Sequence, residues 1–412
     1  MIAPLDVQLD RDDRTMVQPD VLVVCDRGKV VRRCVYGAPD FVAEILSKST
    51  WEKDMYVKLG KYEAAGVREY WIVDPKKKRV LVYDFEHTDF PALYTFMDQI
   101  PVGIFDGESG EESMELTEEI LRDALHYGKA FTKLGRTAQY IPELRAVNRY
   151  YLGICTMDLD GNVLEVGDTR VPFTIQSISK LVSLILAIRD CGADHLFHEK
   201  VGVEPTGDPF NSIVKLETKT RPFNPFINAG AITVASCIQG KDADEKFGRF
   251  LEFTRKLCNN HEIALNQPVY ESERETGDRN RALAYYLKAS GILEGDVEEC
   301  LDFYFRMCSV DVTAHDIAYM SLVLANHGID PLDGEELIEP QYAKAIRALM
   351  LTCGMYDGSG EFAMTVGFPA KSGVGGGIAV PLVDRMGIGV FGPALDEKGN
   401  SAGGIKILEY LS

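Results

Sequence analysis

Two polar side chains stand three positions apart at the start of the most apolar segment of the chain. Ser177 and Lys180 precede residues 181–188, which are apolar except for one serine. On a helix, side chains with this spacing project from one face. Burial lowers the pKa of a lysine, and a neutral amine beside a hydroxyl is a base beside a nucleophile. The pair therefore predicts covalent catalysis by a serine, with developing negative charge favoured by the helix N-terminus.

The same spacing has a purely structural interpretation. Ser177 can cap the helix by accepting a bond from a free backbone N–H. Lys180 can carry its ammonium to solvent on an apolar stem. A lone Ser-x-x-Lys pair does not distinguish catalysis from helix capping. The choice between them depends on other segments of the chain.

The composition limits the classes of function. A length of 412 residues predicts two or three domains, and a hydrophobic content of 46% predicts a globular protein. The net charge of −19 opposes binding to a phosphate backbone. Residues 1–105 carry a net charge of −2 and residues 106–412 a net charge of −17, so nucleic acid is an unlikely partner and would have to bind the first part.

Targeting and redox signals favour the cytoplasm. The nine cysteines are odd in number and include no Cys-x-x-Cys pair, which favours reduced thiols over a disulfide framework. The first six residues do not begin a signal peptide, and the longest apolar runs are too short to span a bilayer. We expect a soluble, cytoplasmic protein without membrane contact.

The first part predicts a small α/β sheet. Strands are expected at residues 21–24, 41–46, 70–73 and 79–85, with a helix over 53–65 that ends at Gly66. Asp20 and Glu44 lie on or beside strands, and Lys58 lies on the helix. Two carboxylates and a lysine can hold Mg²⁺ and polarise a phosphodiester, although solvent-facing charges on an edge of the sheet explain them as well.

The segments 17–21, 37–47 and 58–75 resemble the Uma-type restriction endonucleases of the PD-(D/E)xK nuclease superfamily, over about residues 3–85. The resemblance implies metal binding by Asp20 and Glu44, with Lys58 as a lysine moved onto the helix. The first helices and the first strand of that family, with their own acidic residue, have no counterpart. We therefore expect a truncated, inactive remnant or docking module.

The second part predicts an α+β domain. An acidic linker over residues 106–119 contains seven acids and no base, and a helix capped by Thr117 follows up to Gly135. Hairpins are expected at 150–166 and 376–391, a mostly helical middle at 241–328, and a final helix from about Ala402. The predicted domains are 1–105, the linker 106–119, and 120–412, the last an antiparallel sheet with a helical cluster.

Four polar or aromatic stretches interrupt this second part. Residues 224–232 suggest turn and cap chemistry, residues 270–280 a loop, and residues 303–305 an aromatic stripe in the core. Residues 371–378 are glycine-rich without the spacing of a phosphate-binding loop. Glycines at that point would let a ligand approach the backbone closely.

With the Ser-x-x-Lys segment 173–180, these stretches and the segments 304–309 and 353–357 resemble the serine-dependent glutaminases, over about residues 120–410. The resemblance implies a β-lactamase/DD-peptidase-like fold, no metal or cofactor, and a homodimer or homotetramer. It implies an amidohydrolase that converts L-glutamine to L-glutamate and ammonia, with Ser177 as the nucleophile and Lys180 as the base.

The same resemblance implies roles for further residues. Tyr304 would relay a proton to the leaving ammonia, and the backbone N–H groups of Ser177 and Val374 would hold the oxyanion. The remaining implied substrate contacts are Glu273 to the α-ammonium, Asn228 and Asn280 to the α-carboxylate, and Tyr356 closing over the ligand.

Two alternatives share some of these residues. A penicillin-binding protein or β-lactamase would use Ser177 and Lys180, but we find neither an export signal nor a Ser-x-Asn segment. A nucleic-acid enzyme would work through Asp20, Glu44 and Lys58. Metal-dependent DNA cleavage that is lost on Glu44→Ala would support it.

Overall fold

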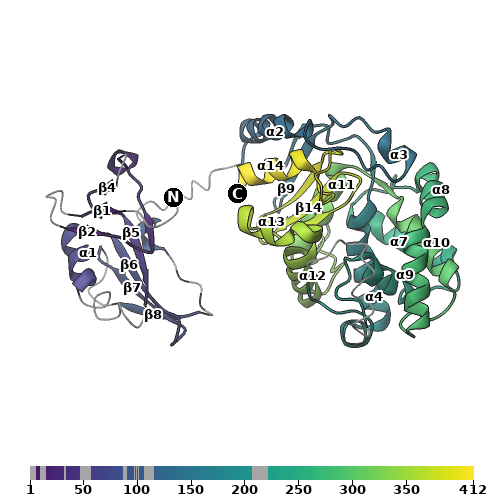
Figure 1. Cartoon of the computed structure of the whole chain (residues 1–412), viewed down its shortest axis with the longest axis horizontal. Helices are drawn as coiled ribbons and strands as arrows, with labels where there is room; N and C mark the ends of the chain where they lie inside the picture. The colour runs from purple at the N-terminus through teal and green to yellow at the C-terminus, as the bar shows by residue number, and fades with distance from the viewer. Residues whose placement is uncertain are drawn as a thin grey trace. The chain divides into compact units, whose positions relative to one another are not determined.

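The computed structural model describes residues 6–9, 15–31, 34–46, 57–86, 91–96, 98, 100, 102–105, 116–206 and 221–412. The chain forms two compact units, Met1–Glu115 and Leu116–Ser412 (Figure 1). Residues 106–115 of the predicted linker and residues 53–56 of the first predicted helix lie outside the described residues. No helix among the described residues is both long enough and apolar enough to cross a membrane.

The described residues of the first unit form two small sheets and one α-helix. Its elements are β1 (Val7–Gln8), β2 (Met16–Val17), β3 (Val21–Val23), β4 (Val35–Tyr36), β5 (Phe41–Ile45), α1 (Leu59–Ala65), β6 (Glu69–Asp74), β7 (Arg79–Asp84) and β8 (Ala92–Thr95). The larger sheet has the order β3-β5-β6-β7-β8, and the smaller one β2-β1-β4. The predicted α/β sheet is confirmed.

A parallel pair organises this unit. Strands β5 and β6 run parallel, and α1 lies in the connection between them, as parallel pairing requires. Gly66 ends α1 with φ of 86°, a left-handed conformation that favours glycine. Tyr62 from the helix and Tyr70 from β6 are fully buried and in contact in the core.

The second unit combines a five-stranded antiparallel sheet with a cluster of helices. The strands of that sheet are β9 (Gly153–Asp158), β10 (Val163–Gly167), β13 (Lys371–Ser372), β14 (Gly377–Leu382) and β15 (Met386–Phe391), and a separate two-stranded sheet pairs β11 (Phe173–Thr174) with β12 (Asp311–Val312). Its helices are α2 (Glu118–Thr132), α3 (Pro142–Arg145), α4 (Ser179–Cys191), α5 (Ala193–His195), α6 (Asn228–Ser236), α7 (Ala243–Leu257), α8 (Gln267–Thr276), α9 (Asp278–Ala289), α10 (Val297–Cys308), α11 (Ala314–Ala325), α12 (Pro340–Cys353), α13 (Ser359–Thr365) and α14 (Ala402–Leu411).

The sheet has the order β10-β9-β15-β14-β13 and is covered on both faces. Helices α2 and α14 pack together over one face, and α11 lies on the other (Figure 1). Small and large residues alternate along β15, so its two faces differ in how closely a helix can pack on them. A Cβ on Gly387 or Gly389 would lie only 2.2 or 1.9 Å from the backbone of α11, while Ile388 and Val390 fill the core on the opposite face.

Most predicted elements of this unit are confirmed, including both hairpins, the final helix, and the Thr117 cap on α2. Two expectations are wrong. Ser177 does not cap α4, because it lies inside a 3₁₀ turn over Gln176–Ile178 and α4 has no side-chain cap. Residues 270–280 are not a loop: they belong to α8, which Asn266 caps, and to the start of α9.

Candidate active site

The second unit contains a cavity of about 440 Å³. It is lined by the 3₁₀ turn at Gln176–Ile178, by α6, α8, α9 and α10, and by the segment that follows the edge strand β13. Among the residues that line it are six of the predicted site residues: Ser177, Asn228, Glu273, Asn280, Tyr304 and Val374. Lys180 and Tyr356 do not line it. A cavity of this size can hold an amino acid.

The segment that presents Ser177 is held in an unusual backbone conformation. Gln176 has a positive φ of 48°, which costs energy for a residue with a side chain and is typical of functional sites. The turn directs Ser177 toward the cavity, and the first turn of α4 places Lys180 behind it, fully inside the protein with 1% of its surface exposed.

Lys180 is a buried amine with two hydrogen bonds. Its Nζ donates to the backbone oxygen of Phe226 and to Oδ1 of Asn228, both at 2.9 Å. Burial lowers its pKa from 10.5 to about 8, and a thiolate at Cys308 would act in the opposite direction. No carboxylate pairs with it among these contacts, so its neutral form is accessible near physiological pH. Neither of its two hydrogen bonds goes to Ser177.

Asn228 and Asn280 continue this hydrogen-bond chain into the cavity. Asn228 uses its oxygen for Lys180 and donates from Nδ2 to Oδ1 of Asn280 at 3.0 Å. The turn before α6 is built by Asn224, whose Oδ1 accepts the backbone N–H groups of Phe226 and Ile227. The predicted turn chemistry at this segment is therefore present, and it positions both contacts of Lys180.

Glu273 lies on α8 with 7% of its surface exposed. Its Oε1 accepts a hydrogen bond from the hydroxyl of Tyr140 at 2.7 Å and from Nε2 of Gln176 at 3.2 Å. Burial raises the pKa of the Glu273 carboxyl above 4.5, although the two hydrogen bonds act in the opposite direction. A buried carboxylate with no cation among these partners is a suitable site for a ligand ammonium.

Tyr140 and Gln176 were not among the predicted site residues. Gln176 stands inside the Ser-x-x-Lys segment, so its position was a usable signal. Tyr140 lies 133 positions from Glu273 in the sequence, and no local pattern marks it.

Tyr304 and Tyr356 are both buried tyrosines near the nucleophile. Burial raises the pKa of each phenol, so both are neutral proton donors near pH 7. Tyr304 lines the cavity from α10, although the surrounding aromatic stripe is core as predicted. The Tyr356 hydroxyl lies beside Ser177 and the backbone N–H of Val374, and its φ of 56° is also left-handed.

The glycine-rich segment packs against the turn that carries the nucleophile. A Cβ on Gly373 or Gly375 would lie 2.8 or 2.3 Å from the backbone oxygens of Ile175 or Thr174. These glycines therefore admit the neighbouring backbone, whereas we had expected them to admit a ligand. The close approach is what brings Val374 alongside Ser177.

Lys371 is a second fully buried amine that the sequence did not single out as a site residue. Its Nζ donates to the backbone oxygens of Ser372 at 2.6 Å and of Gly354 at 3.3 Å. It also lies 4.9 Å from the ring centre of Tyr356. Burial and the charge of Lys180 hold its pKa well below 10.5. Lys371 therefore braces the backbone and the aromatic ring next to the nucleophile.

The candidate residues of the first unit form a different arrangement. Glu44 is 2% exposed, and its Oε1 accepts from Lys58 Nζ at 2.8 Å and from the Tyr62 hydroxyl at 2.7 Å. Asp20 is exposed, and its Oδ2 accepts the backbone N–H of Ile45 at 2.7 Å. Glu44 and Lys58 are thus brought together, and Asp20 meets the residue next to Glu44.

Comparisons with known proteins agree with both resemblances. Residues 135–412 match the glutaminase family model, and residues 1–96 match the Uma2 family model, whose description is 'putative restriction endonuclease'. A glutaminase of Clostridium botulinum is 53% identical over 295 residues, which are 71% of this chain and 96% of that protein.

Solved structures give the same result for the fold. The crystal structure of a protein described as a Bacillus subtilis probable glutaminase is 43% identical with a TM-score of 0.66, over 71% of this chain and 94% of that chain. The Bacillus subtilis glutaminase YbgJ, in its covalent complex with 5-oxo-L-norleucine, is 41% identical with a TM-score of 0.65, over 71% of this chain and 96% of that chain.

Proposed function

The chain belongs to the glutaminase family, and we propose that its second unit hydrolyses L-glutamine through an acyl-enzyme formed on Ser177. The observation that carries the proposal is the pairing of a hydroxyl at the cavity wall with a fully buried amine one helical turn away. The covalent adduct of the related YbgJ glutaminase supports a nucleophilic mechanism.

In the first half-reaction, Ser177 Oγ attacks the side-chain amide carbon and its proton passes to neutral Lys180. The C–N bond then breaks, and ammonia leaves with a proton supplied through Tyr304, which regains one from Lys180. In the second half-reaction, water attacks the acyl carbon and gives up a proton to Lys180, the bond to Ser177 Oγ breaks, Ser177 Oγ takes that proton from Lys180, and glutamate leaves. Because Lys180 donates to Phe226 and Asn228, its lone pair must turn toward Ser177 when it loses its proton.

The oxyanion of the tetrahedral intermediate is held between the backbone N–H groups of Ser177 and Val374. Two features support this placement. The strained turn at Gln176 fixes the first N–H, and the tight packing of Gly373 and Gly375 fixes the second. Donors fixed in advance stabilise developing charge without reorganisation in the transition state.

The amino-acid end of the substrate is recognised by charge and hydrogen bonds. Glu273 accepts a hydrogen bond from the α-ammonium of the substrate. The two donors that bind this carboxylate in the structure, Tyr140 and Gln176, are both neutral, so the ammonium would be its cationic partner. Asn228 and Asn280, which also line the cavity, contact the α-carboxylate. Tyr356 closes over the ligand, and its position beside Ser177 and the backbone N–H of Val374 supports this role.

A change of Ser177 to Ala tests this assignment. We expect Ser177→Ala to abolish ammonia release, measured by coupled glutamate dehydrogenase assay, while glutamine binding measured by calorimetry stays within a few-fold. Turnover of a chromogenic β-lactam without turnover of glutamine would favour the penicillin-binding alternative instead. Normal ammonia release by Ser177→Ala would refute the nucleophile.

We also propose that the enzyme works in the cytoplasm as a homodimer or homotetramer, and that the first unit is an inactive remnant or docking module. The free state of all nine cysteines supports a reducing compartment. The bonds of Glu44 to Lys58 and Tyr62 support a structural use of this carboxylate. Metal-dependent cleavage of DNA by the purified protein, lost in Glu44→Ala, would overturn the inactive assignment.

A further inference from the structure

A group of three potential metal ligands lies outside the glutamine site, between the sheet and the start of α11. Cys155 on β9 and Glu165 on β10 are directly paired across the two antiparallel strands, so their side chains share one face of the sheet. His315 follows in the first turn of α11, the helix that covers this face. None of the three lines the cavity at Ser177.

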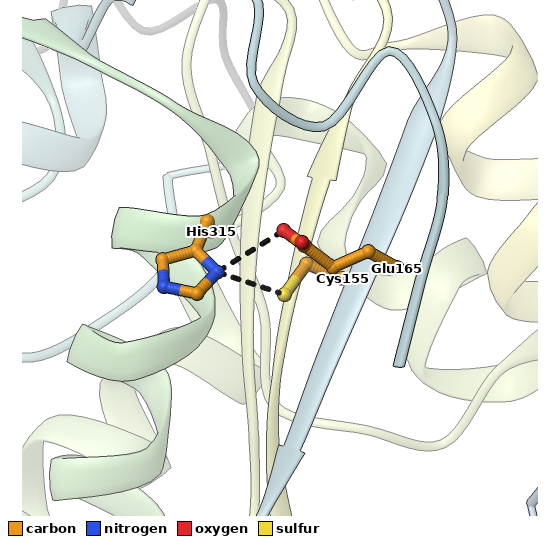
Figure 2. Close-up of side chains that lie close together, drawn as sticks. All are labelled: Cys155, Glu165 and His315. Carbon is orange, nitrogen blue, oxygen red and sulfur yellow. Dashed lines mark hydrogen bonds and ion pairs between the residues drawn. The ribbon is translucent and has the colours of Figure 1, made fainter. Parts of the chain in front are cut away.

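The three side chains converge on one atom (Figure 2). His315 Nδ1 lies 3.0 Å from Oε1 of Glu165 and 3.8 Å from Sγ of Cys155. One ligand atom from each residue falls within 4.8 Å of the other two, and no other such group of three occurs among the residues that the structure describes.

This geometry does not suit a hydrogen-bond relay. A Cys-His-carboxylate relay needs the thiol and the carboxylate on different ring nitrogens, so that one orients the imidazole while the other exchanges a proton. Here the carboxylate and the thiol both meet Nδ1, and the thiol also lies within hydrogen-bond reach of Glu165, so the imidazole does not stand between them. Three ligand atoms that all lie close to one another are what a shared cation requires.

The separations match those of metal ligands. In a tetrahedral zinc site, Zn–S is about 2.3 Å and Zn–N or Zn–O about 2.0 Å, which places S and N about 3.5 Å apart and N and O about 3.3 Å apart. The observed 3.8 and 3.0 Å differ from these values by about 0.3 Å each, so small side-chain rotations would admit the ion.

We propose that Cys155, Glu165 and His315 bind a divalent transition-metal ion of the Zn²⁺ type, with water as the fourth ligand. The mixed S, N and O donors suit zinc better than Mg²⁺ or Ca²⁺. Cys155 is fully buried, while the Glu165 and His315 side chains are 25% and 27% exposed and give the ion a path from solvent.

The surroundings orient the ligands. Arg170 binds the other oxygen of Glu165, Oε2, at 2.8 Å, which leaves Oε1 for the ion. Burial and the charge of Glu165 raise the pKa of the Cys155 thiol, so binding releases its proton. His315 must carry its remaining proton on Nε2. Affinity therefore increases with pH.

The ion would be structural, since it ties two strands to the start of α11. This helix follows β12, and β12 pairs with β11, which leads directly to the turn carrying Ser177. A metal here would stabilise the support of the nucleophile without touching the substrate.

Binding of Zn²⁺ and Co²⁺ to the full chain, freed of metal by chelation, tests the proposal. We expect one equivalent of Zn²⁺ by calorimetry and a thiolate-to-cobalt charge-transfer band in the near ultraviolet with Co²⁺. Cys155→Ser should lose this band, and His315→Gln should weaken Zn²⁺ binding by more than about tenfold. Control variants are Cys300→Ser, another buried cysteine, and His327→Gln, which removes a histidine paired with Asp384.

Wild-type protein that takes up no stoichiometric Zn²⁺, or a cobalt band that persists in Cys155→Ser, would overturn the proposal. If Cys155→Ser does not fold, Glu165→Gln and His315→Gln decide: binding as tight as in the wild type in both variants would also overturn it. A melting temperature raised by Zn²⁺ in the wild type and in both controls, but not in His315→Gln, would support it.

Discussion

The pKa of Lys180 makes the proposed mechanism quantitative. Burial lowers it from 10.5 to about 8, which corresponds to about 3 kcal/mol disfavouring the ammonium form inside the protein. Only the neutral amine can accept the proton of Ser177. The neutral fraction is about 3% at pH 6.5 and about 90% at pH 9, so kcat/KM should rise about 30-fold over this interval.

The variant Lys180→Arg separates proton acceptance from charge. A guanidinium stays protonated across this range and cannot act as the base, so we expect loss of turnover at every pH, with no recovery toward pH 9. Lys246→Arg is the matched control, because Lys246 is a partly buried lysine on α7 paired with Glu299. It should keep the wild-type profile.

The assay is continuous ammonia detection under kcat/KM conditions, from pH 6.5 to 9, with a thermal melt of each protein at both limits. The profile of kcat/KM reports groups of the free enzyme. A wild-type profile that is flat between these limits would refute the reasoning. So would folded Lys180→Arg protein whose rate still rises through pH 8.

Three further predictions test the substrate contacts, the packing of the site and the independence of the second unit. Glu273→Gln should raise KM about 10- to 150-fold, because a hydrogen bond to a charged group contributes about 1.5–3 kcal/mol. The control is Glu271→Gln, which changes an exposed acid on the same helix. An equal rise in KM in both variants would argue against a direct contact between Glu273 and the substrate. Gly375→Ala should lower the free energy of unfolding by about 1–3 kcal/mol in chemical denaturation, because its Cβ would lie 2.3 Å from a backbone oxygen. Gly360→Ala should leave this free energy unchanged, because no atom lies within 4 Å of a Cβ at that position. Similar losses of stability in both variants would contradict the packing argument. A shortened chain starting at Leu116 should fold and release ammonia within about a factor of two of the full chain, as expected of a compact unit, and a folded but inactive product would show that the first unit is needed for catalysis.

Local patterns were sufficient for much of the fold. The hairpin predicted at 376–391 and the apolar run of α4 each correspond to elements that the structure contains. Residues 270–280 were misjudged because their high polarity outweighed a helix start that was readable at Asn266 and Pro268. Long polar side chains do not oppose a helix when one face is buried.

The site was predictable only where it lies within a motif. Ser177 and Lys180 are three positions apart in one motif, but the direction of the Ser177 hydroxyl depends on the left-handed Gln176, which no spacing rule reveals. The partner of Glu273 at Tyr140 and the convergence of Cys155, Glu165 and His315 both depend on tertiary packing between distant segments.

The central claim, that Ser177 is the residue that forms the covalent intermediate, has one direct measurement. The full chain is incubated with 6-diazo-5-oxo-L-norleucine, the reagent that gave the covalent complex of the related YbgJ glutaminase, and is examined by intact and peptide mass spectrometry. We predict one adduct per chain, located on Ser177 and absent in Ser177→Ala. An adduct on another residue, or equal labelling of Ser177→Ala, would contradict the mechanism.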